Sequence, residues 1–381
     1  MKSRYNTILR SMAALMAAFA ITACGNKQDP VADTTPTVAE PLCDSVCLYR
    51  PGDYGSTNWR IPALLCLDDG TLLAVNDKRK YNETDLPEDI DVVYRLSRDK
   101  GYTWTEPQTM IEGRGRGKGY GDPALVQCAN GDVICAFAGH NGYFQSTAAN
   151  PICIFYCRST DRGQTWSDTV NITEVAWDAN SNYHASFIAS GNGLRLKRGE
   201  HAGRILFAAS LLRNGENVSD NYILYSDDNG QTWQRSQMAF RGGDESKLIE
   251  LVDGRVLISV RRSGARGWNT SDDGGETWGQ QGVWNEITVN ACNGDMLRLD
   301  DTTLIHSVPN SMQRENVSLY VSNDEGLSWH SPRLLTAGPS TYSSLTMLPD
   351  GTIGCYVERG TNGHMELWYY RFNRAWLEKR P

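Results

Sequence analysis

The chain of 381 residues carries 37 Lys and Arg against 45 Asp and Glu, which gives a formal net charge of −8. Such an acidic surface does not favour binding to nucleic acid or to anionic lipid. After residue 21 no apolar run is long enough to cross a bilayer. The composition therefore excludes a nucleic-acid-binding protein and a multi-spanning membrane protein, and any anionic ligand must be attracted locally.

The N-terminus has the pattern of an export signal. Lys2, Arg4 and Arg10 precede an apolar run over residues 12–21, which is too short to span a membrane. The following Ile-Thr-Ala-Cys resembles a bacterial lipobox. We therefore predict a lipoprotein signal peptide over residues 1–23 and a lipid on Cys24. Removal of this signal lowers the net charge from −8 to −11, because the segment contains those three basic residues and no acidic ones.

A tether and a single domain are expected after the signal. Residues 25–42 are rich in Pro, Thr and acidic residues, as is typical of a flexible linker. We predict a tether over 24–42 and one domain over 43–381. The expected location is the bacterial cell envelope, facing the periplasm or the cell surface, with membrane contact through the lipid alone.

Nine cysteines remain besides Cys24. Five lie in apolar stretches and are predicted to be small core residues: Cys66, Cys135, Cys153, Cys157 and Cys355. Cys43 and Cys47 are the candidate disulfide pair.

An eight-residue repeat organises the domain. The pattern Ser-x-Asp-x-Gly-x-Ser/Thr-Trp begins at residues 97, 159, 226, 271 and 322. In a hairpin turn the Asp can accept hydrogen bonds from amides two residues on, and the Gly supplies the positive φ that closes the turn. The Trp is expected to fold beneath the hairpin as an apolar plug. These five aspartates are therefore interpreted as structural.

The segments between the repeats read as short strands, among them 204–210, 256–260 and 354–357, separated by Asp-Gly or Asn-Gly turns. Successive repeats start 62, 67, 45 and 51 residues apart, about one four-stranded sheet each. We predict an all-β fold, a six-bladed β-propeller with five Asp-box hairpins. The sixth blade, which lacks a box, is expected to be closed by strands from both ends of the domain.

The order of motifs resembles one known family. An Arg-Ile-Pro tripeptide at 60–62 precedes the five boxes, and Tyr-Ser-Ser-Leu follows at 342–345. From about Tyr54 to Trp376 the chain resembles the bacterial exo-α-sialidases, or neuraminidases, of glycoside hydrolase family 33. The resemblance implies hydrolysis of terminal α-linked sialic acids from glycoconjugates with retention, through a tyrosyl-enzyme intermediate. Sialylated glycans are the expected partners of a monomer, and no metal or other cofactor is implied.

Three arginines outside the boxes are candidates for binding a carboxylate. Arg60, Arg261 and Arg314 each fall at a strand end in a different predicted blade. Three convergent guanidiniums can clamp a single carboxylate. The resemblance implies that they bind the carboxylate of sialic acid. It also favours Arg261 over the adjacent Arg262, because the segment that starts at Glu245 matches the family at Glu245 and Arg261.

The nucleophile has to suit a substrate whose anomeric carbon already bears a carboxylate. An Asp or Glu nucleophile would be repelled by that charge, so a neutral group is preferable. The resemblance implies that Tyr342 is the nucleophile and Glu245 its base; sialidases are a recognised exception to the two-carboxylate rule of glycosidases. The base is needed because a free phenol has a pKa near 10.

The resemblance also implies an acid/base aspartate and three supporting residues. Asp85 is the expected acid. Glu83, Glu88 and Asp89 are the alternatives, because Pro87 and Glu88 are extra residues relative to the family and shift the alignment of this loop by a residue or two. The supporting residues are Arg79 for a sugar hydroxyl, Asp122 near the N-acyl and C4 substituents, and Glu358 as a brace for Arg60.

The sequence is also compatible with other activities. A trans-sialidase, or an intramolecular sialidase that forms an anhydro product, would use the same residues. A non-catalytic glycan-binding propeller would not need Tyr342, Glu245 and Asp85 beside an intact arginine triad.

Overall fold

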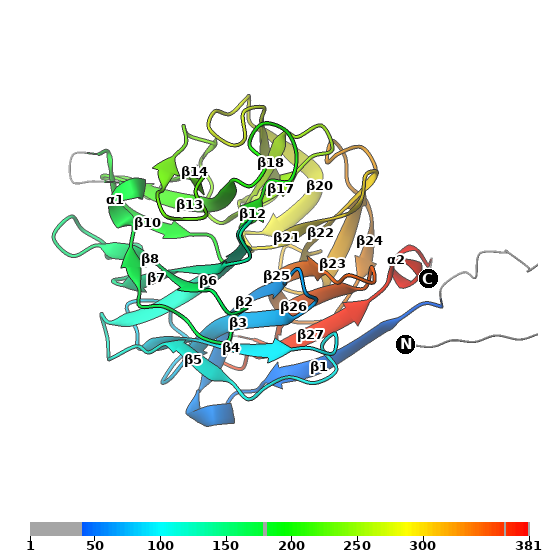
Figure 1. Ribbon diagram of the computed structural model, residues 1–381, viewed down its shortest axis with the longest axis horizontal. Coiled ribbons are helices and arrows are strands. Elements are labelled where there is room, and N and C mark those ends of the chain that lie inside the picture. The colour runs from blue at the N-terminus through cyan, green and yellow to red at the C-terminus, as the bar shows by residue number, and fades with distance from the viewer. Residues whose placement is uncertain (1–39, 178–180, 362, 380–381) are drawn as a thin grey trace, which may run out of the picture. The chain divides into compact units, whose positions relative to one another are not determined.

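The computed structural model of the protein describes residues 40–177, 181–361 and 363–379 (Figure 1). The predicted signal peptide, Cys24 and most of the predicted tether lie outside these residues. Over the described ranges, no helix is both long enough and apolar enough to cross a membrane.

Six sheets, antiparallel except for the short β11–β6 pair, follow one another along the chain, as the colours of Figure 1 show. Blade 1 contains β2 (Asn58–Cys66), β3 (Leu72–Arg79), β4 (Ile90–Ser97) and β5 (Gln108–Ile111). Blade 2 contains β6 (Gly119–Gln127), β7 (Val133–His140), β8 (Ile152–Ser159) and β9 (Val170–Asn171), and β11 (Gly191–Asn192) pairs in parallel with β6. Blade 3 contains β10 (Tyr183–Ile188), β13 (Ile205–Arg213), β14 (Ser219–Ser226) and β15 (Gln234–Arg235), with the short β12 (Leu194–Arg195) and β16 (Phe240–Arg241) at its edges.

The second half of the chain forms the remaining blades. Blade 4 contains β17 (Ser246–Glu250), β18 (Val256–Val260), β19 (Ser263–Ser271) and β20 (Gly282–Asn290). Blade 5 contains β21 (Asp295–Asp300), β22 (Thr303–Pro309), β23 (Val317–Ser322) and β24 (His330–Leu334). Blade 6 contains β25 (Ser340–Met347), β26 (Ile353–Arg359) and β27 (Glu366–Phe372). The helical pieces are short: a 3₁₀ turn (Asp53–Gly55), α1 (Thr173–Ala176) and α2 (Arg374–Glu378).

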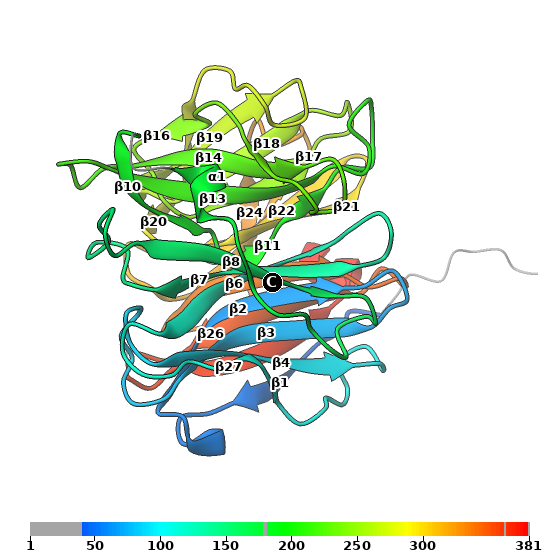
Figure 2. The same ribbon diagram turned by 60° about the vertical axis from the view of Figure 1, so that its left-hand side comes forward.

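The two ends of the domain close the propeller. β1 (Cys43–Tyr49) is the outer strand of blade 6 and pairs with β27, with Cys43 opposite Phe372. Figure 2 shows β2 of the first blade next to β26 of the last. The predicted six-bladed propeller, with a sixth blade built from both ends, is confirmed.

The hydrophobic core lies between neighbouring blades. Each of the six large buried clusters combines side chains from two consecutive blades, and the cluster between blades 6 and 1 completes the ring. The tryptophan of each box packs on the cluster shared with the preceding blade: Trp104, Trp166, Trp233, Trp278 and Trp329. The box tryptophan therefore fills the space between two blades.

Each box is a turn between the third and fourth strands of its blade. In the first box the Gly101 amide donates to Ser97 Oγ at 2.8 Å, and the Thr103 amide donates to Asp99 Oδ1 at 2.9 Å. Gly101 has φ +87°, as the predicted turn requires. The aspartate accepts from the amide four residues later, whereas the sequence suggested two. The four other boxes repeat this pattern.

The suggested Cys43–Cys47 disulfide is wrong, because both thiols are free. The two residues are four positions apart on the extended strand β1. At roughly 3.3 Å per residue their Cα atoms are about 13 Å apart, twice the span that a disulfide bridges. Of the five predicted core cysteines, four are buried and Cys66 is half-buried.

Candidate active site

β-Bulges displace three inner strands near the start of each strand. The pairing of β2 with β3 shifts between Arg60 and Ala63, and Ile61 there has φ +61°. A left-handed conformation is unusual for a β-branched residue. Pro62 lacks an amide hydrogen, so it is tolerated where the ladder is interrupted. The Arg-Ile-Pro tripeptide therefore forms a bulge directly after Arg60.

Blade 2 has the same kind of bulge at Gly121-Asp122-Pro123. The pairing of β6 with β7 shifts between Gly121 and Ala124, and Asp122 has φ +58°. The inner strand of blade 6 also changes register, between Ser340 and Ser343, on either side of Tyr342. The same end of three inner strands is thus irregular, and each irregularity carries one of the predicted site residues.

Glu358 of β26 fixes the position of Arg60. Its Oε1 accepts from Arg60 Nε at 2.7 Å and from the Ile61 amide at 2.6 Å. Its Oε2 accepts from the Thr341 hydroxyl. Glu358 is fully buried, and burial acts to raise its pKa. The charge and hydrogen bond of Arg60, together with the hydrogen bonds from Thr341 and Ile61, outweigh burial and hold the pKa below its usual value. Arg60 is therefore oriented in the protein without bound ligand, and its two terminal nitrogens make no hydrogen bond to other described residues.

The three predicted carboxylate-binding arginines surround one aromatic ring. The guanidinium carbon of Arg60 is 5.5 Å from the centre of the Tyr342 ring, and that of Arg314 is 5.7 Å from it. Arg261 Nη1 donates to the Tyr342 hydroxyl at 2.7 Å. Arg314 comes from the loop between β22 and β23, where its Nη2 donates to the Ala291 carbonyl at 2.8 Å. The fold therefore gathers arginines from blades 1, 4 and 5 around a tyrosine of blade 6.

Tyr342 donates its hydroxyl hydrogen to Glu245. The distance from Tyr342 Oη to Glu245 Oε2 is 2.6 Å, and Arg261 contacts both groups. Burial, opposed by Arg261, raises the pKa of Tyr342 well above 10. The phenol is consequently neutral in the free protein. Its proton is already hydrogen-bonded to the Glu245 carboxylate, which can accept it.

Arg79 holds the loop that carries Asp85. Arg79 Nη2 lies 2.5 Å from Asp85 Oδ1 and 3.2 Å from Asp77 Oδ2, while Nη1 donates to the Glu83 carbonyl. The Asp85 side chain is 76% exposed. Its residual desolvation acts to raise its pKa, but Arg79 and Arg60 outweigh that effect and lower it.

None of the three alternatives to Asp85 has a carboxylate that contacts Arg79. The Asp89 carboxylate binds Lys80 at 3.1 Å, and the Glu88 carboxylate pairs with Arg116. Glu83 reaches Arg79 only through its backbone carbonyl. Among the four acids considered in this loop, Asp85 is the one whose carboxylate contacts Arg79.

Asp122 lies beside a second buried carboxylate, Asp77. The Asp122 amide donates to Asp77 Oδ1 at 3.0 Å. Burial, opposed by Arg79, raises the pKa of Asp77 to about 7. Burial and the proximity of Asp77 raise the pKa of Asp122 well above its usual value. This part of the site can therefore retain a proton at neutral pH and offer a hydrogen-bond donor to a sugar.

Some residues of the site were not identified from the sequence. Asp77 could have been found, since it lies two positions before Arg79 on a strand and so shares its face. Asp244, whose Oδ1 is 3.3 Å from Arg261 Nε, adjoins Glu245 but gave no signal of its own. Cys292 packs with Ile61 and Tyr342 in a small buried cluster that only the tertiary structure reveals.

A family model described as BNR repeat-like domain matches residues 70–355, most of the domain. The chain belongs to the BNR repeat-like domain family. This BNR repeat-like protein is 31% identical to a sialidase of Micromonospora viridifaciens over 390 residues, which cover 96% of this chain and 59% of that protein. A sialidase of Bacteroides fragilis (strain YCH46) is 29% identical over 348 residues, with coverage of 82% and 62%. The chain thus spans about three fifths of the length of these two relatives.

Solved structures support the fold. The intramolecular trans-sialidase from Ruminococcus gnavus, in complex with oseltamivir carboxylate, matches with a TM-score of 0.76 and 20% identity, over 87% of this chain and 98% of that one. The resemblance of the BNR repeat-like protein to bacterial sialidases, predicted from its motifs, is confirmed by these relatives.

Proposed function

We propose that this BNR repeat-like protein is an exo-α-sialidase that removes terminal α-linked sialic acids from glycans with retention of configuration. One observation carries the proposal: a buried, neutral tyrosine donates its hydrogen bond to a glutamate and lies among three arginines from different blades. A carboxylate-bearing anomeric centre needs such a combination of cationic clamp and neutral nucleophile.

In the first step the clamp holds the substrate carboxylate and the tyrosine attacks. Arg60, Arg261 and Arg314 receive the carboxylate beside the Tyr342 ring. Tyr342 Oη forms a bond to the anomeric carbon while its proton passes to Glu245, which is 2.6 Å away. The glycosidic bond breaks, and its oxygen takes a proton from Asp85. Water then attacks the anomeric carbon of the tyrosyl intermediate and gives a proton to Asp85 as base. The bond from that carbon to Tyr342 Oη breaks, and the phenolate takes its proton back from Glu245, so two inversions give net retention.

The charge state of Asp85 has to change when substrate binds. In the free protein Arg79 and Arg60 lower its pKa against residual desolvation, so the carboxylate is ionised at neutral pH. A bound substrate carboxylate offsets the charge of Arg60 and Arg261 and removes solvent from the exposed Asp85. Both changes raise the pKa of Asp85, which favours its protonated form when acid catalysis is required.

Product analysis tests this proposal. We expect ¹H NMR of a sialyl-lactose digest to show the α-anomer of free sialic acid first, followed by mutarotation to the β-anomer. An initial β-anomer would contradict retention. A 2,7-anhydro product, or transfer to added lactose, would instead assign the intramolecular or transfer reaction, both of which use the same residues. Binding of sialyl-lactose without any cleavage would instead indicate a non-catalytic, glycan-binding propeller.

We also propose that the protein is exported and held at the cell envelope by a lipid on Cys24. The support is the basic, apolar and Ile-Thr-Ala-Cys sequence of residues 1–24. Cys24→Ala should move the protein from the detergent-soluble membrane fraction to the soluble fraction with unchanged activity per molecule. Membrane association that persists in the variant would contradict the anchor.

A further inference from the structure

A basic, glycine-rich segment at residues 113–119 has no part in the mechanism proposed above. It reads Gly-Arg-Gly-Arg-Gly-Lys-Gly and connects β5, the outer strand of blade 1, to β6, the inner strand of blade 2. β6 begins at Gly119, three positions before the bulge residue Asp122. The glycine segment, defined as residues 113–119, therefore reaches the end of the inner strands where the proposed active site lies.

The glycine segment binds the loop that carries Asp85. The Gly117 amide donates to the Pro87 carbonyl at 2.6 Å, two positions after Asp85. Arg116 adds an ion pair with the Glu88 carboxylate. The loop turns at this point, because the Glu88 amide donates to the Asp85 carbonyl at 3.3 Å. Both contacts with the glycine segment thus hold residues of the turn that begins at Asp85.

Close backbone packing accounts for two of the glycines in the segment. A methyl group on Gly119 would overlap the Glu88 carbonyl oxygen, and one on Gly113 would lie 2.5 Å from the Ile90 carbonyl oxygen. Neither glycine has a positive φ, so backbone conformation does not require glycine at either position. Glycine is the default residue where one backbone approaches another closely. The missing side chains therefore let the segment lie directly on the backbone of residues 88–90.

The position of the Asp85 carboxylate depends on the backbone of its loop. Among the described residues, Arg79 is the one hydrogen-bond partner of this carboxylate, at 2.5 Å, and the side chain is 76% exposed. The next residue, Leu86, is buried in a cluster with Ala138 of blade 2 and Ala185 of blade 3. A general acid has to lie within hydrogen-bond reach of the atom that it protonates. An exposed acid with one side-chain contact meets this condition only if its backbone is held in place.

We propose that the glycine segment supports the Asp85 loop and that Gly119 is a positioning residue for acid catalysis. The inference rests on the proposed function, in which Asp85 protonates the leaving oxygen. Gly119 pairs with His140 of β7, so the sheet fixes its position and the loop is the part that yields to a new side chain. A methyl group at position 119 displaces the Glu88 backbone, whose amide is bonded to Asp85. The acid then moves relative to the leaving oxygen.

The leaving-group dependence of Gly119→Ala tests this role. We expect kcat/KM for sialyl-lactose to fall by about 10²-fold, the loss that a misplacement of about 1 Å can cause. An aryl sialoside, whose phenol leaves without a proton, should be cleaved nearly as fast as by wild type and with an unchanged KM. A variant that is only destabilised would lose both activities equally, so the ratio of the two rates reports the position of the acid.

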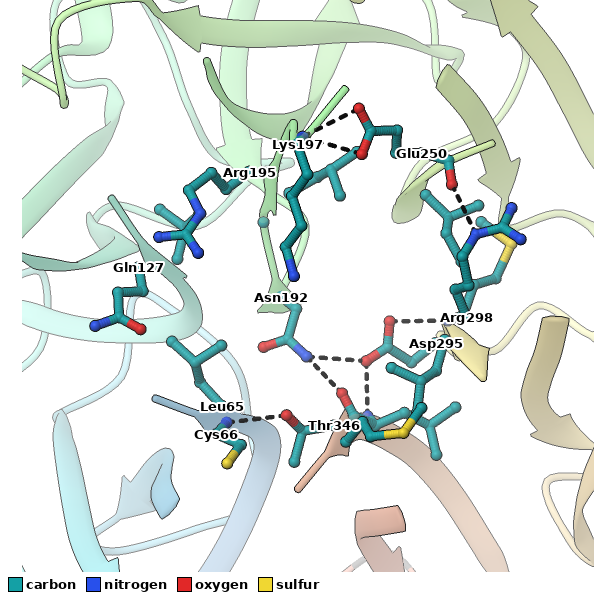
Figure 3. Close-up of a pocket in the computed structure, with 18 of the residues that line it drawn as sticks. Leu65, Cys66, Gln127, Asn192, Arg195, Lys197, Glu250, Asp295, Arg298 and Thr346 are labelled. Carbon is teal, nitrogen blue, oxygen red and sulfur yellow. Dashed lines mark hydrogen bonds between the residues drawn. The ribbon is translucent and has the colours of Figure 1, made fainter. Parts of the chain in front are cut away.

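Gly193→Ala is the matched control. It also has no positive φ, and its methyl group would lie 2.8 Å from a backbone oxygen, that of Leu206. The Gly193 amide donates to the Leu125 carbonyl, six positions after Gly119 on β6, which is about 20 Å at roughly 3.3 Å per residue. Gly193 lines an open cavity at that end of the inner strands, where Figure 3 shows the preceding Asn192. This control should leave the ratio of the two rates unchanged.

The other outcomes separate this inference from the proposed function. Equal losses on both substrates in Gly119→Ala, or no loss on either, overturn the positioning role if Asp85→Ala still slows sialyl-lactose selectively. A selective loss of the same size in Gly193→Ala also overturns it, because the ratio would then respond to any packing defect. Equal losses in Asp85→Ala refute the acid assignment, and a wild type that cleaves neither substrate refutes the proposed function; the positioning role fails with either. If Gly119→Ala does not fold, Gly113→Ala applies the same test with a milder overlap, and an unchanged ratio there overturns the inference.

Discussion

Replacing Glu358 with glutamine removes the negative charge that compensates Arg60 while keeping the shape of the side chain. The carboxylate is fully buried, and Arg60 is 8% exposed. All the groups that hydrogen-bond the carboxylate are donors: Arg60 Nε, the Ile61 and Tyr342 amides and the Thr341 hydroxyl. The glutamine oxygen can keep the contacts at 2.7 and 2.6 Å. Its NH₂ then faces the Thr341 hydroxyl, which can rotate to accept, and the Tyr342 amide, whose 3.4 Å contact is lost.

The cost is mainly that of an unpaired buried cation. Removing one partner of a buried ion pair destabilises a protein by about 3–5 kcal/mol. Because the amide preserves two hydrogen bonds, we expect a loss near the lower limit, about 3 kcal/mol. Equilibrium urea unfolding of wild type and Glu358→Gln measures this difference.

A matched control uses the same substitution at an exposed pair. Glu378 pairs with Arg374 at 2.5 Å, with the side chains 56% and 47% exposed. Exposed i,i+4 pairs contribute about 0.3–0.5 kcal/mol, so Glu378→Gln should have little effect. If Glu358→Gln costs less than about 1 kcal/mol, the range of exposed pairs, then Arg60 is compensated by solvent and the proposed brace is absent.

The same contact predicts a pH dependence. The pKa of Glu358 is lower in the folded protein than in the unfolded chain, since Arg60 and the hydrogen bonds from Thr341 and Ile61 together outweigh the effect of burial. The stabilisation is therefore fully present above the unfolded value of about 4.3 and is lost as the pH falls through the folded pKa. The stability difference between wild type and Glu358→Gln should thus shrink below about pH 4.3, whereas a constant difference would mean that ionisation of Glu358 is not its source.

Three further predictions concern the chemistry and the boxes. Asp85→Ala should slow hydrolysis of sialyl-lactose far more than that of an aryl sialoside, because general-acid help of about 10²–10⁴-fold matters only for a poor leaving group; equal losses would move the acid to another residue of the loop. A fluorinated sialic acid should leave a covalent adduct on Tyr342, detectable by peptide mass spectrometry and formed more slowly in Glu245→Gln, and an adduct on any other residue would overturn the mechanism. Asp161→Ala should lower unfolding free energy by roughly 0.5–3 kcal/mol with kcat nearly unchanged, so a large kcat loss at full stability would contradict a purely structural box.

The fold was predictable because its main signals are local. The box turn closes through contacts within eight residues, such as Gly101 to Ser97 and Thr103 to Asp99, so its sequence is sufficient to recognise it. The distance between successive boxes then corresponds to about four strands, which is one blade. The absence of a sixth box indicates that the last blade is completed by a strand from the N-terminus. The disulfide suggestion failed for the opposite reason: Cys43 and Cys47 are close in sequence, but an extended strand keeps them apart.

The sequence by itself determined the number of blades and the residue types at the irregular strand ends. Arg60 precedes a bulge that contains a proline, and Asp122 lies within a second such bulge. Only the tertiary structure decided which charges meet. Glu358 is 298 residues from Arg60, and Glu245 is 97 residues from Tyr342. Pairing over such separations depends on closure of the ring between blades 6 and 1 and on the register of each inner strand. Those long-range contacts also set the pKa of Tyr342, because burial and neighbouring charge are properties of the folded propeller rather than of any segment.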